Sequence, residues 1–130
     1  MNFYNQNFAP HPEGEGGAAC MVAAIEDAGL TPNDIDYINA HGTSTHMNDA
    51  CETMAIKKAL GDHAKDIKIN STKSFIGHML GAAGAIELLT CVKEMEDGYI
   101  HPTAGYTVAD EECDLDIVPN EGRKATACRC

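Results

Sequence analysis

Two short polar segments, residues 39–45 and 71–78, contain the side chains best suited to chemistry in this sequence. Each follows a short apolar run and precedes a helical pattern, so each is expected where a strand ends. Ligands bind beyond the carboxyl ends of strands in open α/β sheets, and we therefore expect His41 and His78 to face a common site. Two imidazoles there could donate two N–H bonds to an oxyanion that develops during a reaction. Lys73 would add a fixed positive charge nearby.

Each candidate residue also has an ordinary structural explanation. A single His at a strand end is more often a hydrogen-bonded structural residue than a catalyst, and Lys73 alone would be a solvated surface charge. Thr43 and Thr45 would be turn and capping hydroxyls, and Glu87 would pair with a nearby base on a helix. The residue pattern alone leaves the catalytic and the structural interpretation open.

The spacing of apolar residues predicts the elements that must position these side chains. Helices are expected at 16–28, 49–60 and 78–95, and strands at 35–39, 67–70 and 115–118. Gly29 and Gly61 follow the first two helical patterns and favour their ends there. This alternation predicts an α/β layer architecture with strands between packed helices.

Length and charge exclude several classes of function. The chain has 130 residues and a formal net charge of −11, so it is a poor candidate for binding nucleic acid or an anionic membrane. It has no apolar run of the ~18 residues that a transmembrane helix needs, and its first residues do not form a signal peptide. We therefore expect a cytoplasmic protein with neither a nucleic-acid nor a membrane partner.

Cysteines, histidines and glycines give no sign of a metal or phosphate site. Without a secretory signal, the six cysteines are expected to be reduced thiols, and the Cys-x-Cys at the chain end is too weak a signal for zinc. His41 and His46 are five positions apart, which does not place them on one helical face. The spacing of Gly77, Gly81 and Gly84 fits no phosphate-binding motif and favours a helix that another backbone approaches closely.

Four strings of the sequence, in order, resemble the C-terminal part of an elongating (type II) β-ketoacyl-[acyl-carrier-protein] synthase, a condensing enzyme of the thiolase-like fold. They lie at residues 12–17, 37–45, 71–87 and 113–120. The similarity extends over most of the chain, from about residue 12 to residue 123. The resemblance implies an acyltransferase that joins an acyl thioester to malonyl-carrier protein by decarboxylative Claisen condensation in fatty-acid biosynthesis.

The resemblance also implies roles for individual residues. His41 and His78 match two active-site histidines that stabilise the enolate formed when malonate loses its carboxylate. Lys73 matches an active-site lysine with an electrostatic and orienting role, and Glu87 matches a glutamate that supports the lysine and histidine network.

Substrate and partner expectations follow from the same resemblance. Thr43 and Thr45 match threonines that hydrogen-bond the phosphopantetheine arm of the substrate. No cofactor is then expected, because the substrate itself carries phosphopantetheine, and no metal is expected either. The implied partners are acyl-carrier protein and malonyl-carrier protein, and the parent enzyme is expected to be a homodimer.

One departure from the family decides what the chain is expected to do alone. The family nucleophile is a cysteine at a helix N-terminus in the other half of the enzyme, and none of the six cysteines here lies in that motif. We expect residues 1–123 to form part of the C-terminal ketosynthase domain, incomplete at both ends, with a non-matching tail at 124–130. The isolated chain is expected to be inactive. Alternatives are a non-catalytic interaction subunit, or a chain-length factor or polyketide ketosynthase piece of the same fold.

Overall fold

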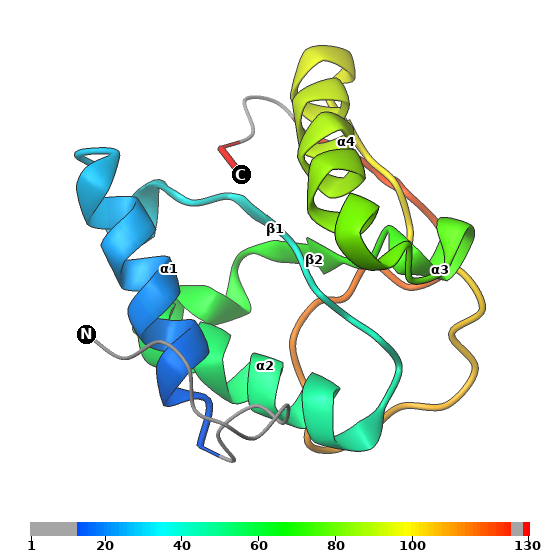
Figure 1. Cartoon of the computed structure of the whole chain (residues 1–130), viewed down its shortest axis with the longest axis horizontal. Coiled ribbons are helices and arrows are strands. Elements are labelled where there is room, and N and C mark those ends of the chain that lie inside the picture. Colours follow the sequence, from blue (N-terminus) through cyan, green and yellow to red (C-terminus); the bar gives the residue numbers. More distant parts are fainter. Residues whose placement is uncertain (1–12, 126–128) are drawn as a thin grey trace.

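The computed structural model describes residues 13–125 and 129–130, and Figure 1 shows their arrangement. The predicted mixture of helices and short strands is confirmed. In chain order the elements are α1 (Glu15–Asp27), η1 (Pro32–Asp34), β1 (Tyr37–Asn39), α2 (His46–Leu60), η2 (Gly61–Lys65), β2 (Lys68–Asn70), α3 (Lys73–Ile76), η3 (Leu80–Ala82), α4 (Ala83–Asp97), β3 (Tyr99–Ile100) and β4 (Arg123–Lys124), where η marks a 3₁₀ turn.

A pair of parallel strands lies at the centre of the molecule. β1 and β2 pair with Ile38 opposite Ile69 and Asn39 opposite Asn70. Figure 1 shows this pair between α1 and α2 on one side and α4 on the other. Because the strands are parallel and in this register, the chain leaves both of them at the same edge. The two polar segments of the sequence therefore start side by side.

The main hydrophobic core lies between α1, α2 and the strand pair. Its buried residues include Ile25 from α1, Ile56 and Leu60 from α2, and Ile69 from β2. Gly14 at the N-cap of α1 has a φ of +67°, and a Cβ there would lie 2.7 Å from the Cys51 carbonyl oxygen. Glycine is therefore needed where α1 begins against α2.

The predicted strand at 115–118 is wrong. This segment lies beside β2, since Ile69 N–H donates to the Asp116 carbonyl at 2.8 Å, but it forms no ladder. The Asp116 carboxylate accepts the Val118 N–H at 3.2 Å, and Val118 has a φ of +46°. This local hydrogen bond and the left-handed backbone together break the extended conformation.

The predicted helix at 78–95 begins later than expected, and the one at 49–60 begins earlier. Residues 73–76 form the short helix α3, which ends at Gly77 with a φ of +70°. A 3₁₀ turn follows, and the long helix α4 starts only at Ala83. Leu80 also has a positive φ, of 49°, so the backbone cannot continue from α3 into α4 as one helix.

The C-terminal residues lie along the start of β1. β4 pairs with β3 in antiparallel fashion, and the Arg129 carbonyl accepts hydrogen bonds from the N–H groups of Asp36 and Tyr37, at 3.0 and 3.3 Å. The predicted boundary after residue 123 falls inside β4 and stays a prediction.

Within residues 13–125 and 129–130, no helix has the length and apolar character to cross a membrane.

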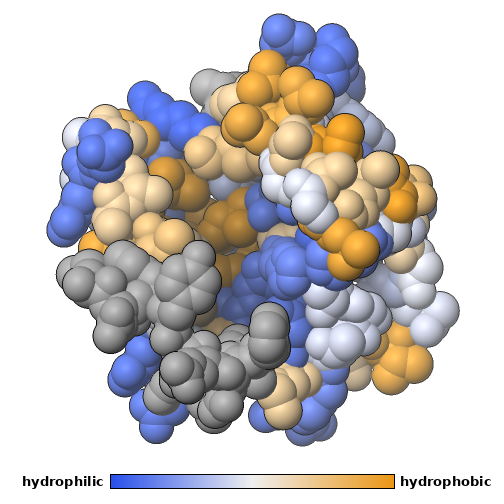
Figure 2. All heavy atoms as spheres, in the orientation of Figure 1, coloured by the Kyte–Doolittle hydropathy of each residue, from blue (hydrophilic) through white to orange (hydrophobic). Residues whose placement is uncertain are grey.

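One side of α4 carries large apolar side chains that the described chain does not cover. Leu88, Leu89, Val92 and Met95 are all exposed, Leu88 at 65% and Leu89 at 64%. Their spacing places them on one side of the helix, called here the α4 face. Figure 2 shows apolar side chains gathered over α4.

The prediction that another backbone approaches the glycines nearby is not met within the described residues, since nothing lies within 4 Å of a Cβ built at Gly81 or Gly84.

Candidate active site

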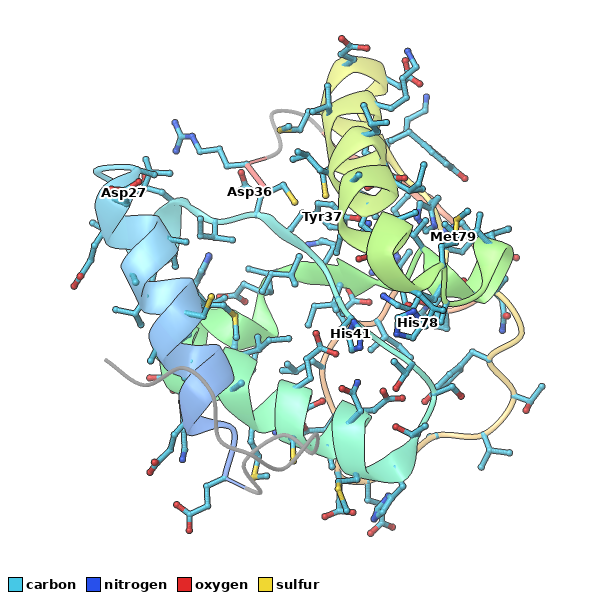
Figure 3. All side chains as sticks on the ribbon, in the orientation of Figure 1. Asp27, Asp36, Tyr37, His41, His78 and Met79 are labelled. Atoms are coloured by element: carbon cyan, nitrogen blue, oxygen red, sulfur yellow. The ribbon has the colours of Figure 1, made fainter. Side chains whose placement is uncertain are left out.

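His41 and His78 come together at the ends of the two parallel strands. Their ring centroids are 5.2 Å apart, and the ring planes cross at 86°. Figure 3 shows the two labelled side chains meeting between the loop after β1 and the segment before α4. Both side chains are exposed in this chain. The sequence expectation that these histidines share one site therefore agrees with the geometry.

The hydrogen bond of His78 defines which ring nitrogen can donate. Its Nδ1 accepts the backbone N–H of Leu80 at 3.1 Å. A neutral imidazole with an accepting Nδ1 carries its proton on Nε2. His78 therefore presents an N–H donor on the side of the ring away from its own backbone. The positive φ of Leu80 belongs to the turn that makes this bond.

A carboxylate from α2 holds the backbone next to His41. Glu52 accepts the His41 N–H at 2.7 Å and the Gly42 N–H at 2.9 Å, one on each oxygen. Charge-assisted bonds of this kind are stronger than neutral ones. Sequence reasoning missed Glu52, because nothing in its local pattern shows that α2 folds back under this loop.

The two strand-end loops touch at Gly42 and Ser71. The Ser71 hydroxyl donates to the Gly42 carbonyl at 2.8 Å. Gly42 has a φ of +43°, and a Cβ there would lie 2.6 Å from both Cβ and Oγ of Ser71. Only glycine fits this contact, so the His-Gly pair reflects a steric need as well as a chemical one.

Lys73 and Glu87 form a buried ion pair beside the histidines. Lys73 begins α3, Glu87 lies in the second turn of α4, and Nζ contacts Oε1. The side chains are only 5% and 16% exposed. The alternative of a solvated surface lysine is thus wrong for Lys73. A buried pair of this kind keeps each charge in place, because removing one partner would leave the other uncompensated.

Thr43 and Thr45 line a cavity next to this pair. Their hydroxyl oxygens are 3.0 Å apart, and Thr45 occupies the N-cap position of α2 without a side-chain capping bond. The cavity measures about 810 Å³, and its wall includes both threonines, Lys73 and His78. His41 and Glu87 are not part of this wall. The arrangement can take an extended polar chain along the threonines and present its end to His78.

A buried polar network behind the strands was not foreseen from the sequence. Asn70 accepts the Tyr37 hydroxyl at 2.6 Å and donates to Glu94 at 3.1 Å and to the His101 carbonyl at 2.8 Å. Burial, and the nearby Glu94 carboxylate, raise the pKa of Tyr37 far above its ordinary value. Thr72 joins this network through His101 at 3.1 Å, so it fixes the backbone just before Lys73.

An exposed cluster lies beyond the threonines, at the start of α2. His46 contacts Glu112 at 3.2 Å and Asp110 at 3.7 Å. One imidazole and two carboxylates are metal-ligand types, and their ligand atoms lie within 4.8 Å of one another. All three are exposed, and such groups are common without an ion. The expectation of no metal site stays a prediction.

Comparisons with known proteins confirm the resemblance. The model of the family "Beta-ketoacyl synthase, C-terminal domain" matches residues 2–107. The chain is 52% identical over 115 residues to 3-oxoacyl-[acyl-carrier-protein] synthase 2 of Staphylococcus aureus, which covers 88% of this chain and 28% of the relative. The enzyme of the same name from Coxiella burnetii is also 52% identical, with the same coverage. The chain thus spans little more than a quarter of the length of these relatives.

Solved structures show the same fold. A type II polyketide ketosynthase, in complex with its acyl-carrier protein and bound to the hexaketide, matches with a TM-score of 0.88 and 42% identity. That match covers 94% of this chain and 31% of the other. A β-ketoacyl synthase from Burkholderia phymatum matches with a TM-score of 0.85 and 36% identity, over 95% of this chain and 30% of the other. The fold is therefore the expected thiolase-like α/β architecture in part, and the chain belongs to the β-ketoacyl synthase family, within its C-terminal domain.

Proposed function

We propose that this chain supplies the oxyanion-stabilising part of a β-ketoacyl-acyl-carrier-protein synthase. The whole enzyme would condense an acyl thioester with malonyl-carrier protein by decarboxylative Claisen condensation in fatty-acid biosynthesis. The observation that carries the proposal is the His41–His78 pair, with ring centroids 5.2 Å apart at the ends of two parallel strands.

The reaction needs a group that stabilises charge on an oxygen. When the bond between the malonyl carbon and its carboxylate breaks, carbon dioxide leaves and the electron pair moves onto the thioester oxygen as an enolate. His78 offers its Nε2–H, because Nδ1 is occupied by the Leu80 N–H. A second donor from His41 would share the same oxygen. Donors aimed where charge develops lower the barrier more than they strengthen ground-state binding.

The enolate carbon then attacks the acyl thioester carbonyl. A new carbon–carbon bond forms, and the thiolate of the acylated cysteine leaves. Lys73 does not act as the nucleophile in this scheme, since its ammonium is buried against Glu87. The pair instead fixes a charge beside His78 and links α3 to α4, so it orients the imidazole.

The threonines and the cavity support a pantetheine arm as the substrate portion bound here. Thr43 and Thr45 place two hydroxyls 3.0 Å apart in the wall of the cavity of about 810 Å³.

A solved relative at 42% identity is a ketosynthase in complex with its acyl-carrier protein, which supports carrier proteins as partners. The net charge of −11 argues that the basic docking patch for an acidic carrier lies outside this chain. A homodimeric parent enzyme, the lack of a cofactor and the cytoplasmic location stay predictions.

A chimera tests the role of the histidines. Residues 13–123 would replace the matching part of the Staphylococcus aureus relative, and decarboxylation of malonyl-carrier protein would be measured. We expect His41→Ala and His78→Ala each to lower the rate about 100-fold or more, as for the loss of an oxyanion donor. His63→Ala, which changes an imidazole of η2 outside the wall of the cavity, is the control and should stay near the parent rate. An unchanged rate of decarboxylation in the variant that combines His41→Ala with His78→Ala would refute the proposal.

The isolated chain is expected not to condense acyl groups. Cys20, Cys51 and Cys91 lie well inside helices, and Cys113 and Cys130 lie outside helices, so none of these five occupies a helix N-terminus where a thiolate is favoured. Cys128 lies outside the described residues. A β-ketoacyl product formed by the pure 130-residue chain would contradict this expectation.

A polyketide ketosynthase or chain-length factor is the second candidate. It is supported by the likeness to the ishigamide ketosynthase/chain length factor, with a TM-score of 0.83 and 38% identity over 91% of this chain. Reading the coding sequence upstream separates the candidates. A nucleophilic cysteine in the matching position favours a condensing enzyme, and another residue there favours the chain-length factor or a non-catalytic interaction subunit.

A further inference from the structure

Two cysteines far apart in the sequence meet at the C-terminal end of the chain. The Sγ atoms of Cys91 and Cys130 lie 3.0 Å apart, although the residues are 39 positions apart. A formed disulfide has its sulfurs 2.03–2.05 Å apart, so the two sulfurs would have to approach each other by about 1 Å. We propose that Cys91 and Cys130 are a redox modification site, at which an oxidant closes a reversible disulfide between α4 and the C-terminus. The proposal does not depend on the condensing activity.

The fold, rather than sequence proximity, holds the two thiols together. Arg129 is anchored on the start of β1 by its backbone, which bonds to Asp36 and Tyr37, and its guanidinium contacts Asp34 at 3.1 Å. This anchoring places the next residue over α4. Cys91 lies on the buried side of α4, in the small cluster that includes Tyr37.

The two thiols differ in a way that suits stepwise oxidation. Cys130 is exposed, so a small oxidant can reach it, and Cys91 is buried. Although Cys130 as a whole is exposed, its sulfur packs against Cys91 and is partly buried. The hydrogen bonds with Cys91 and with the Asn39 backbone lower the pKa of the Cys130 thiol, although the partial burial and the Glu94 carboxylate oppose this shift. A lower pKa increases the thiolate fraction, and the thiolate is the form that peroxides oxidise. Cys130 is therefore the attacking thiol and Cys91 the resolving one.

The chemistry balances with one peroxide. The Cys130 thiolate attacks a peroxide oxygen, the O–O bond breaks, and a sulfenic acid forms on Cys130 with release of hydroxide, which takes up a proton to become water. The Cys91 sulfur then attacks the sulfenic sulfur, loses its proton and displaces a second water as the S–S bond forms. In total two thiols lose two electrons and two protons, and hydrogen peroxide is reduced to two waters. A thiol reductant reverses the change by exchange.

The bond would join elements that position the candidate active site. Cys91 lies one helical turn after Glu87, the partner of Lys73, and Cys130 lies over the start of the strand that leads to His41. A cross-link here restricts the unfolded chain and the separation of α4 from β1. Oxidation is thus expected to stabilise the arrangement around the site without adding a group to it.

Mass spectrometry of the full 130-residue chain tests the site. The chain is fully reduced, exposed to a small excess of hydrogen peroxide, blocked with an alkylating agent and digested. We expect the intact mass to fall by two hydrogens and a linked peptide to contain Cys91 and Cys130. The melting temperature should rise by several degrees on oxidation and return after reduction.

Matched variants separate this pair from the other thiols. Cys130→Ser changes an exposed residue and should abolish the linked peptide and the rise in melting temperature. Cys113→Ser should keep both. Three results would overturn the proposal: alkylation of both thiols after peroxide, a disulfide of Cys91 that persists in Cys130→Ser, or linkage spread over all six cysteines.

Discussion

α2 and α4 are helices of equal length, 15 residues each, that lie on opposite sides of the strand pair and are covered very differently. α2 buries six residues against α1, the strands and the loops. α4 buries three, and one of those is Glu94 rather than an apolar residue. Helix α2 therefore packs most of its apolar side chains within this chain, whereas Leu88 and Leu89 of the α4 face stay 65% and 64% exposed among the described residues.

The difference shows that burial is not set by apolar content alone. α4 is the more apolar of the two helices in its pattern, yet it contributes less to the core. The residues of the candidate active site are divided between the two helices in the same way. Glu52 holds the His41 loop from the covered helix, and Glu87 pairs with Lys73 from the less covered one.

The largest expected effect comes from removing an apolar side chain on the covered helix. Ile56 is 2% exposed, and Ile56→Ala should lower the free energy of unfolding by about 2–5 kcal/mol. Leu88→Ala on α4 removes a side chain that is 65% exposed, so it should change stability by less than about 0.5 kcal/mol. Urea denaturation of both variants measures the contrast. Equal losses would mean that α4 is packed as fully as α2.

A smaller effect is expected where α2 supports the loop that carries His41. In Glu52→Gln one oxygen that accepts the His41 or Gly42 N–H becomes an amide donor, at a cost of about 1–2 kcal/mol. Amide hydrogen exchange at these two residues should become faster. Glu26→Gln, an exposed carboxylate on α1, is the control and should leave exchange in the loop unchanged. Unaltered protection in Glu52→Gln would mean that α2 does not hold the loop.

Substitutions on the α4 face are expected to have the smallest effect on stability and the largest effect on dye binding and self-association. The folded chain should bind a hydrophobic dye and self-associate, because these side chains are exposed. Leu88→Lys combined with Leu89→Lys should reduce both signals and leave the unfolding free energy nearly unchanged. Val108→Lys, which changes a side chain that is 79% exposed in a loop, should not reduce them. A parent chain that is monomeric and binds no dye would show that the face is covered.

The local sequence pattern was enough to predict the elements whose conformation depends on residues close in sequence. The strands ending at Asn39 and Asn70 follow from short apolar runs, and their parallel pairing brings His41 and His78 together. The segment at 115–118 misled because Asp116 bonds its own backbone two residues on. Val118 is still fully buried and Leu115 still packs against the main core, so the apolar run marked buried residues but not a strand.

Contacts between distant segments could not be predicted in the same way. Glu52 reaches the His41 loop, and Asn70 reaches Glu94 and His101, only after the chain has folded. An acidic residue in a helix and an Asn at a strand end are both ordinary in sequence. Their roles depend on buried hydrogen bonds, which carry no periodic signal.

The central strand pair also has a consequence for how copies of this chain can associate. Both outer edges carry hydrogen bonds to non-strand segments: Arg129 on the β1 side and Asp116 on the β2 side. An edge whose backbone groups are already bonded is a poor template for adding a strand from another molecule. Aggregates of this chain should therefore keep a helical circular-dichroism spectrum and remain soluble in mild detergent, in contrast to cross-β fibrils.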